Sequence, residues 1–305
     1  MNSPCGQIVS HPGPSVVVSN RCVGPGWYVL RLVEKQIAAA AQPGQFVQIR
    51  CNDGASQDPL LRRPFSVYAV DRAAGTYDIL YVTVGRGTRW MATLDADDVF
   101  EAPERLDRSE RNGVRVEIAV EGPFGNSFGT VPTDAHVFLV GGGVGVAPLY
   151  FLALELLACA QPPRITLCMG ARSASLLQGI DEFRALAIRT EAATDDGSAG
   201  YKGRVTALLA SLLDEELTSS QRTPPKIFGC GPQGMNDSLR ALAVERELPC
   251  EICLEAIMAC GFGICFGCVA PIRKEVGGEL YHRRMCWEGP VFDARLLSPG
   301  IDGPA

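Results

Sequence analysis

The chain has 305 residues, of which 47% are hydrophobic and 20% are charged, and its formal net charge is −6 at pH 7. This length suffices for two or three domains with buried cores, and the acidic balance excludes the basic surface typical of nucleic-acid-binding proteins. No apolar run reaches the roughly 18 residues of a membrane span, and residues 1–15 lack the basic start and apolar core of a secretory signal.

Residues 15–130 contain short alternating or β-branched runs that are separated by turn signals. The predicted strands are 16–18, 27–32, 46–49, 65–70, 77–84 and 114–118. One short helix is expected in this part, around 87–94. Several short strands at this spacing favour a small antiparallel barrel or sandwich.

From about residue 135, strands and helices alternate. Strands are expected at 137–140, 165–169 and 226–229, and helices at 149–160, 176–186, 205–217 and 234–247. This alternation implies parallel βαβ units and a doubly wound sheet. The sequence therefore predicts a multi-domain protein. It would have an antiparallel β-barrel domain at 1–130, an α/β doubly wound nucleotide-binding domain at 131–249 and a small C-terminal cysteine module at 250–305.

Four cysteines in the last segment have the spacing of a metal centre. A C-x4-C-x2-C run is followed, after seventeen residues, by a fourth cysteine; the four are Cys260, Cys265, Cys268 and Cys286. This is the spacing of plant-type 2Fe–2S ferredoxins, and the glycines at 261, 263 and 267 allow a loop to turn tightly around a cluster. Structural zinc is the alternative, although zinc ligands usually come as two knuckles of paired cysteines.

The remaining cysteines do not suggest disulfides. With twelve cysteines and no secretory signal, we expect reduced thiols in a cytoplasmic protein. Cys250 and Cys253 are close to the cluster motif, but we interpret them as buried thiols at a strand rather than as further ligands.

A second pattern, Arg63-Pro64-Phe65-Ser66, lies on a predicted barrel strand. Alternation places Arg63 and Phe65 on one face, where an arginine can pair with a pyrophosphate and an aromatic ring can stack on a flat heterocycle. Downstream, Gly87 and Thr88 lead into a predicted helix, whose first N–H groups are available to phosphate. Together these residues are typical of a flavin dinucleotide site, whereas the strand motif alone would fit an ordinary half-exposed sheet.

Two turns follow predicted buried strands in the second domain. The glycine-rich turn at 141–148 would let the backbone approach a pyrophosphate, although it lacks G-x-G-x-x-G spacing and a plain tight turn is the alternative. In Cys230-Gly231-Pro232, a small side chain at the end of a strand could lie close to a planar ring; the alternative is a structural cysteine.

The loops after two other predicted strands also carry candidate residues. Asp195 lies in the loop at 194–198, at the edge of the sheet where ligands bind. Arg172 is interpreted as a solvated surface residue rather than as a ligand of a 2′-phosphate.

The order of these motifs resembles that of the ferredoxin–NADP reductase superfamily over nearly the whole chain. The C-terminal module narrows the resemblance. Residues 255–261, Cys265, Cys268 and 286–292, together with 122–126 and 194–198, are similar to the electron-transfer subunits of NAD-dependent dihydroorotate dehydrogenases.

The resemblance implies a chain that carries FAD and one 2Fe–2S cluster and binds a separate FMN-containing catalytic subunit, as a heterotetramer of two of each. In that family, electrons from dihydroorotate pass through the partner's FMN, the cluster and FAD to NAD+, in pyrimidine biosynthesis. By position, the flavin would be held by Arg63, Pro64, Phe65, Ser66, Leu80, Tyr81, Val82, Gly87 and Thr88. The nicotinamide nucleotide would be held by Gly141, Gly142, Gly143, Gly145, Asp195, Gly231 and Pro232. The cluster would be held by Cys260, Cys265, Cys268 and Cys286, with Cys230 acting where nicotinamide and flavin meet.

Two alternatives accompany this hypothesis. The first is a flavin and iron–sulfur subunit of another complex, such as a sulfide dehydrogenase, a ferredoxin–NADP transhydrogenase or a hydrogenase. The run at 258–261 and the ending at 286–292 favour the dihydroorotate family. The second is a non-catalytic adapter with structural zinc, which the intact flavin motif argues against. Two segments depart from the family pattern: a long, charged stretch at 101–116, interpreted as a solvated loop, and a tail after residue 297, expected to be disordered.

Overall fold

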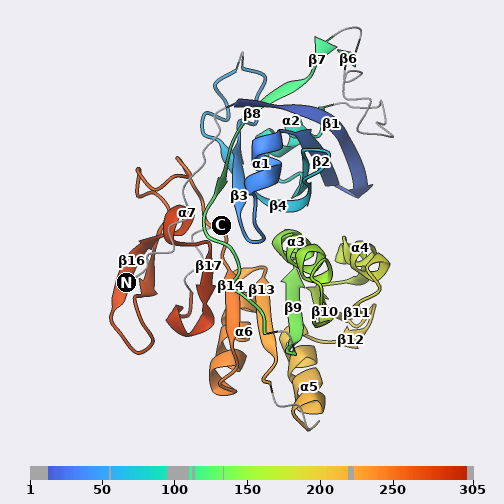
Figure 1. Cartoon of the computed structure of the whole chain (residues 1–305), viewed down its shortest axis with the longest axis vertical. Helices are drawn as coiled ribbons and strands as arrows, with labels where there is room; N and C mark the ends of the chain where they lie inside the picture. The colour runs from blue at the N-terminus through green and yellow to red at the C-terminus, as the bar shows by residue number, and fades with distance from the viewer. Residues whose placement is uncertain are drawn as a thin grey trace.

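The computed structural model describes residues 13–54, 56–94, 110–111, 114–132, 134–218 and 223–300. Most of the charged stretch at 101–116 and the end of the tail, 301–305, lie outside the described residues. Figure 1 shows a barrel (blue to green) above a sheet with helices (green to orange), and C-terminal strands (red) beside them. The structure confirms the predicted fold class.

The first part is a closed antiparallel barrel with the strand order β1-β2-β5-β4-β3-β8. Its strands are β1 (Gly13–Gly24), β2 (Trp27–Val33), β3 (Phe46–Ile49), β4 (Arg63–Asp71), β5 (Thr76–Val82) and β8 (Glu117–Phe124). Alternation along each strand turns one set of side chains inward, and these fill the barrel: Leu30, Leu32, Val47, Ile49, Val67, Tyr77, Ile79 and Tyr81. Two short strands, β6 (Glu110–Arg111) and β7 (Val114–Arg115), pair with each other.

The prediction of a single helix in this part was wrong. The structure has α1 (Lys35–Ala40) as well as α2 (Arg86–Met91). The side chain of Glu34 accepts a 2.6 Å hydrogen bond from the backbone N–H of Ile37 and so caps α1, while Ile37 and Ala38 are buried. Such a short segment has too little periodicity to be recognised from hydrophobic spacing alone.

The second part is a sheet of seven strands in the order β12-β11-β10-β9-β13-β14-β17. The strands are β9 (His136–Gly142), β10 (Arg164–Ala171), β11 (Arg189–Thr194), β12 (Tyr201–Lys202), β13 (Lys226–Cys230), β14 (Cys250–Cys253) and β17 (Val291–Asp293). All pair in parallel except β17, which is antiparallel to β14.

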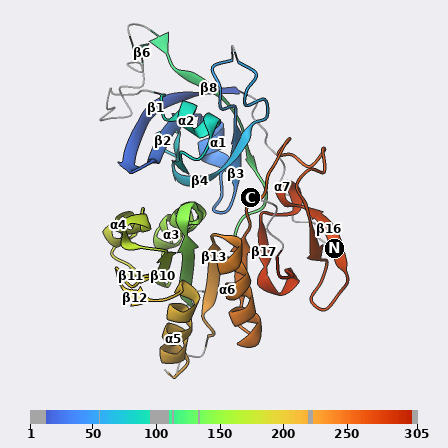
Figure 2. The ribbon, with the colours of Figure 1, turned by 180° about the vertical axis from the view of Figure 1, so that it is seen from behind.

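Helices cover both faces of this sheet: α3 (Val146–Leu157), α4 (Ile180–Ala185), α5 (Val205–Thr218) and α6 (Gln233–Glu245). Val137 and Leu139 of β9 pack with α3, while Phe138 and Val140 pack with α5 and α6 on the other side. Viewed from behind, α3 lies between β4 of the barrel and the sheet (Figure 2). The first buried helix therefore also forms the contact between the two parts. No described helix is long and apolar enough to cross a membrane.

The C-terminal segment contains the hairpin of β15 (Val269–Arg273) and β16 (Leu280–Arg284), followed by α7 (Met285–Glu288). Two of its strands, β14 and β17, complete the edge of the parallel sheet. The division of the chain at 130 and 249 stays a prediction, because strands from the expected third segment lie in the sheet of the second.

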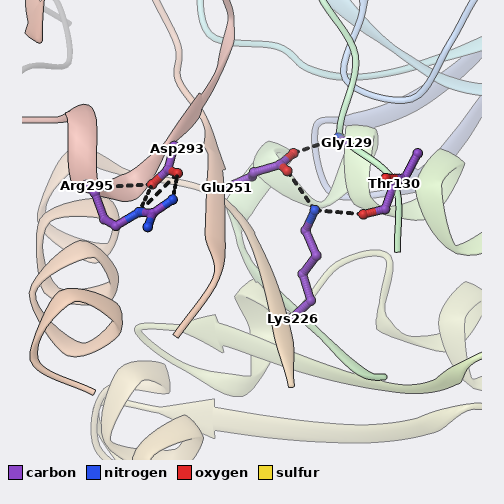
Figure 3. Close-up of polar contacts among 6 residues, drawn as sticks. All are labelled: Gly129, Thr130, Lys226, Glu251, Asp293 and Arg295. Carbon is purple, nitrogen blue, oxygen red and sulfur yellow. Dashed lines mark hydrogen bonds and ion pairs between the residues drawn. The ribbon is translucent and has the colours of Figure 1, made fainter. Parts of the chain in front are cut away.

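A polar network joins the linker after the barrel to β13 and β14 of this sheet (Figure 3). Lys226 Nζ lies 2.7 Å from Glu251 Oε1 and donates to the carbonyl oxygen of Thr130 at 2.9 Å. Glu251 Oε2 accepts a 2.7 Å bond from the backbone N–H of Gly129. Beside this network, Arg295 pairs with Asp293 of β17. The linker is therefore fixed to β13 and β14.

Candidate cofactor sites

The four cysteines of the C-terminal motif lie together as two pairs. Cys268 Sγ and Cys286 Sγ are 3.3 Å apart, and the thiols of Cys260 and Cys265 interact with each other. Cys260 also acts electrostatically on Cys286, so the two pairs are neighbours. The predicted ligands are thus brought together by the loop before β15 and by α7.

Backbone N–H groups in this loop favour thiolates. Partial burial acts to raise the pKa of Cys260, but N–H groups of Cys265, Phe262 and Ile264 lower it to about 7. Interaction with Cys286 lowers the pKa of Cys268 to about 6, against the effect of burial, and correspondingly raises the pKa of Cys286. Because metals bind thiolates rather than thiols, the loop is prepared for a metal centre.

The pairing fits a two-iron cluster better than a zinc ion. A zinc site gathers four ligands around one ion, whereas a 2Fe–2S cluster takes two thiolates on each iron. The pairs Cys268–Cys286 and Cys260–Cys265 match two irons that each take two thiolates.

Arg284 holds the cysteine loop against α7. Its Nη1 donates to the carbonyl oxygen of Gly263 at 3.0 Å, and its Nε donates to Glu288 Oε2 at 3.2 Å. The guanidinium also lies over the rings of Phe266 and Trp287, at 5.1 and 5.6 Å from their centroids. A positive charge therefore lies near the thiols of Cys268 and Cys286.

Cys250 and Cys253 are buried within β14 and do not join the four ligands. Burial raises the pKa of Cys250, so this thiol stays protonated. The interpretation of the two residues as buried strand thiols agrees with this position.

The predicted flavin strand is β4, and Arg63 and Phe65 share one of its faces. Arg63 is exposed, and its Nη1 donates only to the carbonyl oxygens of Leu61 and Arg62 among the described residues. Phe65 is half-buried with its edge against Tyr81, at 6.2 Å between centroids. Arg63 thus keeps donors for an anion, and Phe65 forms part of the barrel wall.

The Gly87-Thr88 turn has structural reasons of its own. A Cβ on Gly87 would lie 2.8 Å from Cβ of Cys51, so only glycine lets α2 pack this closely against the barrel. Thr88 Oγ1 accepts hydrogen bonds from the N–H groups of Val84 and Gly85, at 2.9 and 3.1 Å. The sequence identified the turn, but its local packing already accounts for both residues.

The predicted residues on β5 divide between two surroundings. Leu80 and Val82 face the contact between barrel and sheet, beside Trp27 and Val29. Tyr81 points into the barrel, is 1% exposed and donates from its hydroxyl to Asn20 at 3.1 Å. Tyr81 therefore leaves only its backbone for contact with a ligand.

A cavity of about 400 Å³ opens at the carboxyl edge of the parallel sheet. Four of the predicted nucleotide residues line it: Gly142, Gly143, Asp195 and Pro232. Trp27 of the barrel forms another part of its wall, together with Arg172, Arg204 and Met235. The cavity lies at the sheet edge where doubly wound folds bind nucleotides, and it borders the barrel.

The other predicted glycines serve close packing between two turns. A Cβ on Gly145 would lie 2.4 Å from the carbonyl oxygen of Cys230, and one on Gly231 would lie 3.1 Å from the N–H nitrogen of Gly142. A Cβ on Gly141 would lie 2.8 Å from a methyl group of Val146. Gly145 and Gly231 bring the turns after β9 and β13 into contact, and Gly141 lets β9 pack closely against the start of α3.

Cys230 is the last residue of β13, and it is 2% exposed. It packs with Trp27 of the barrel and with Leu149 of α3 in one buried cluster. Its position is therefore at the contact between sheet and barrel, behind the cavity wall.

Sequence reasoning missed three residues at these sites. Trp27 and Arg204 line the cavity, and Gln48 lies against the cysteine loop. Trp27 was assigned only to a strand, and Arg204 and Gln48 carry no motif. The interpretation of Arg172 as a solvated residue omitted that it borders the cavity.

Comparisons with known proteins agree with this arrangement. The family model described as "Iron-sulfur cluster binding domain of dihydroorotate dehydrogenase B" matches residues 255–298. The chain is 34% identical over 272 residues to a protein of Desulforamulus reducens, covering 88% of this chain and 92% of the relative. A relative from Geobacillus kaustophilus is 35% identical over 283 residues, covering 91% of this chain and 95% of the relative. Both are named "Dihydroorotate dehydrogenase B (NAD(+)), electron transfer subunit".

Solved structures share the fold. An NADH-dependent reduced ferredoxin–NADP oxidoreductase matches with a TM-score of 0.71 and 24% identity, over 95% of this chain and 91% of that one. A ferredoxin–NADP+ reductase from Neisseria gonorrhoeae, solved with bound FAD and NADP, matches with a TM-score of 0.55 and 16% identity, over 79% and 92%. The identity and coverage of the relatives show that the chain belongs to the family of dihydroorotate dehydrogenase B (NAD(+)) electron transfer subunits, as its motifs predict.

Proposed function

We propose that this chain is the electron-transfer subunit of an NAD-dependent dihydroorotate dehydrogenase, an oxidoreductase component that carries FAD and a 2Fe–2S cluster. The observation that carries this proposal is the placement of two thiol pairs and a nucleotide cavity around one barrel. The cysteine loop packs against β3, next to the predicted flavin strand β4, and the cavity borders Trp27 at the start of β2. The relatives favour this family over another flavin and iron–sulfur complex, and the match to an iron–sulfur domain model argues against a zinc adapter.

The cluster is assigned to Cys260, Cys265, Cys268 and Cys286, one thiol pair for each iron. The exposed Arg63, together with Pro64, Phe65 and Ser66, would hold FAD, as would Leu80, Val82, the backbone of Tyr81 and the Gly87-Thr88 turn. A flavin exchanges a hydride with nicotinamide and single electrons with an iron–sulfur cluster, so it is the group required between them. The residues of the chain contribute binding, orientation and local charge.

The cavity at the sheet edge is assigned to NAD. Gly142, Gly143, Asp195 and Pro232 would contact it directly, while Gly145 and Gly231 keep the two turns together and Gly141 packs against α3. Cys230, which lies between the sheet and the barrel, would act where nicotinamide and flavin meet.

The catalytic partner is inferred to contain FMN and to assemble with this chain in the cytoplasm as a heterotetramer of two of each, supplying the oxidation step of pyrimidine biosynthesis. Exposed apolar residues mark where it would dock. Ile264 and Phe266 are 73% and 59% exposed, on either side of the exposed Cys265. Apolar side chains at this exposure beside the electron-carrying group fit an interface with another protein.

Combining the two subunits tests this function. With dihydroorotate and NAD+, we expect NADH to form only when the catalytic subunit from the same organism is mixed with this chain. Ile264→Ser should weaken complex formation while leaving NADH oxidation by ferricyanide unchanged. Val244→Ser, at an exposed position on α6, is the matched control. An inactive mixture, with intact cofactors on both chains, would contradict the proposal.

A further inference from the structure

The outward face of β3 forms the contact between the barrel and the cysteine loop. Val47 and Ile49 point into the barrel core, so Phe46 and Gln48 point outward. Phe46 packs in one buried cluster with Met258, Cys268 and Cys286. On its two sides, Gln48 pairs in register with Pro64 of β4 and Glu121 of β8. Gln48 is therefore beside both the predicted flavin strand and the cysteine loop.

The carboxamide of Gln48 is buried without a hydrogen-bond partner. The residue is 0% exposed, and neither Nε2 nor Oε1 has a partner in the described part of the chain. A buried amide without hydrogen-bond partners destabilises the folded state. Buried amides in proteins are normally hydrogen-bonded, so a bound group that completes the hydrogen bonds of Gln48 would account for its position.

The amide lies directly against the residue that follows the first cluster cysteine. A Cβ built on Gly261 would lie 2.7 Å from Nε2 and 2.6 Å from Cγ of Gln48. Gly261 also has a φ of +83°, a conformation that favours glycine. Any side chain at position 261 would displace the amide, so glycine is required for the loop to contact Gln48.

We propose that Gln48 is a positioning residue for the 2Fe–2S cluster, whose sulfur atoms accept a hydrogen bond from the Gln48 carboxamide. The inference rests on the proposed function only in assigning the cluster to this loop. Hydrogen bonds to sulfur withdraw electron density and stabilise the reduced cluster, which raises its reduction potential. Gln48 would thus raise the reduction potential of the cluster from its position on β3 of the barrel. It belongs to none of the cofactor motifs of the sequence.

The test measures the cluster potential directly in the holo-protein. Gln48→Leu and Gln48→Met keep the bulk of the side chain and remove its donor. In redox titrations followed by electron paramagnetic resonance, we expect the cluster potential of both variants to shift to more negative values. A tenfold fall in the ratio of reduced to oxidised cluster at fixed potential would correspond to a shift of about 59 mV for a one-electron couple. Iron content and the flavin potential, read from absorbance in the same titration, should not change.

Gln45→Leu is the control. Gln45 is three residues earlier, and its Nε2 donates to the carbonyl oxygen of Gly125 at 2.7 Å, so the variant also loses an amide hydrogen bond. It should leave the cluster potential unchanged. An unchanged cluster potential in both Gln48 variants, or a shift in the flavin potential instead, would overturn the inference while leaving the proposed function intact. A wild-type protein without a 2Fe–2S signal would overturn both.

Discussion

The side chain of Asn126 forms two hydrogen bonds with the backbone of Val291, from Nδ2 to the carbonyl oxygen at 2.8 Å and from the N–H group to Oδ1 at 2.9 Å. The backbone N–H of Asn126 also donates to the carbonyl oxygen of Gly289 at 2.7 Å. Asn126 follows the last barrel strand, and Val291 begins β17 just after the last cluster cysteine. One residue therefore ties the barrel to the C-terminal segment.

Replacing Asn126 with alanine should loosen this connection. Loss of the side-chain bonds should lower the free energy of unfolding by about 1–3 kcal/mol, measured by chemical denaturation, and should increase the rate at which iron is lost to a chelator. Gln42→Ala, at an exposed amide on the same part of the barrel, should change neither quantity. Equal iron loss in both variants would contradict this role of Asn126.

Substitution of a cluster ligand should remove bound iron, whereas substitution of another cysteine should not. We expect Cys260→Ser or Cys286→Ser to abolish the 2Fe–2S absorbance and most of the bound iron, because each removes one thiolate of a pair. Cys22→Ser and Cys159→Ser change exposed free thiols and should retain full iron content. Iron content that survives in Cys286→Ser, or zinc bound in place of iron, would refute the ligand assignment.

Gly145→Ala should push apart the turns after β9 and β13. The added Cβ would lie 2.4 Å from the carbonyl oxygen of Cys230, which is backbone and cannot rotate away. We expect a loss of about 1–3 kcal/mol in unfolding free energy and weaker NADH binding by titration. Gly234→Ala in α6 meets no atom within 4 Å and should be neutral or stabilising by up to about 1 kcal/mol. Normal stability of Gly145→Ala would show that the turns are not in close contact.

His136 should make stability depend on pH. Burial lowers its pKa below the ordinary value of 6.5, against the opposite effect of Glu216, and Nε2 lies 2.8 Å from Thr166 Oγ1. Between the lowered pKa and pH 6.5, His136 therefore binds a proton in the unfolded chain but not in the folded chain. The stabilising contribution is complete above pH 6.5 and is lost as the pH falls toward the lowered pKa, by at most about 1.4 kcal/mol per pH unit.

Denaturation curves between pH 7.5 and 5 would reveal this dependence. His136→Gln should flatten the decline in unfolding free energy, and His282→Gln, at an exposed histidine on β16, should leave it unchanged. The same slope in wild type and His136→Gln would rule out this contribution.

The sequence was most informative where chemistry imposes a pattern. The cysteine spacing identified four residues that lie together, and strand alternation identified the barrel and the doubly wound sheet. The short helix α1 was not predicted, because its formation depends on the Glu34 cap and on the burial of two residues. Tyr81 and Thr88 belong to recognisable motifs, yet their side chains already have partners within the barrel and its turn. Gln48 and Trp27 could not be found in this way, since their importance comes from segments distant in sequence.

We expect electrons to pass between nicotinamide, flavin and cluster within this one chain. Low-temperature electron paramagnetic resonance on anaerobically purified protein, before and after addition of NADH, tests it most directly. We predict that NADH produces the signal of a reduced 2Fe–2S cluster, and that Cys286→Ser, still carrying flavin, shows none. A wild-type protein that contains flavin and iron but gives no such signal with NADH, although dithionite reduces its cluster, would contradict the account.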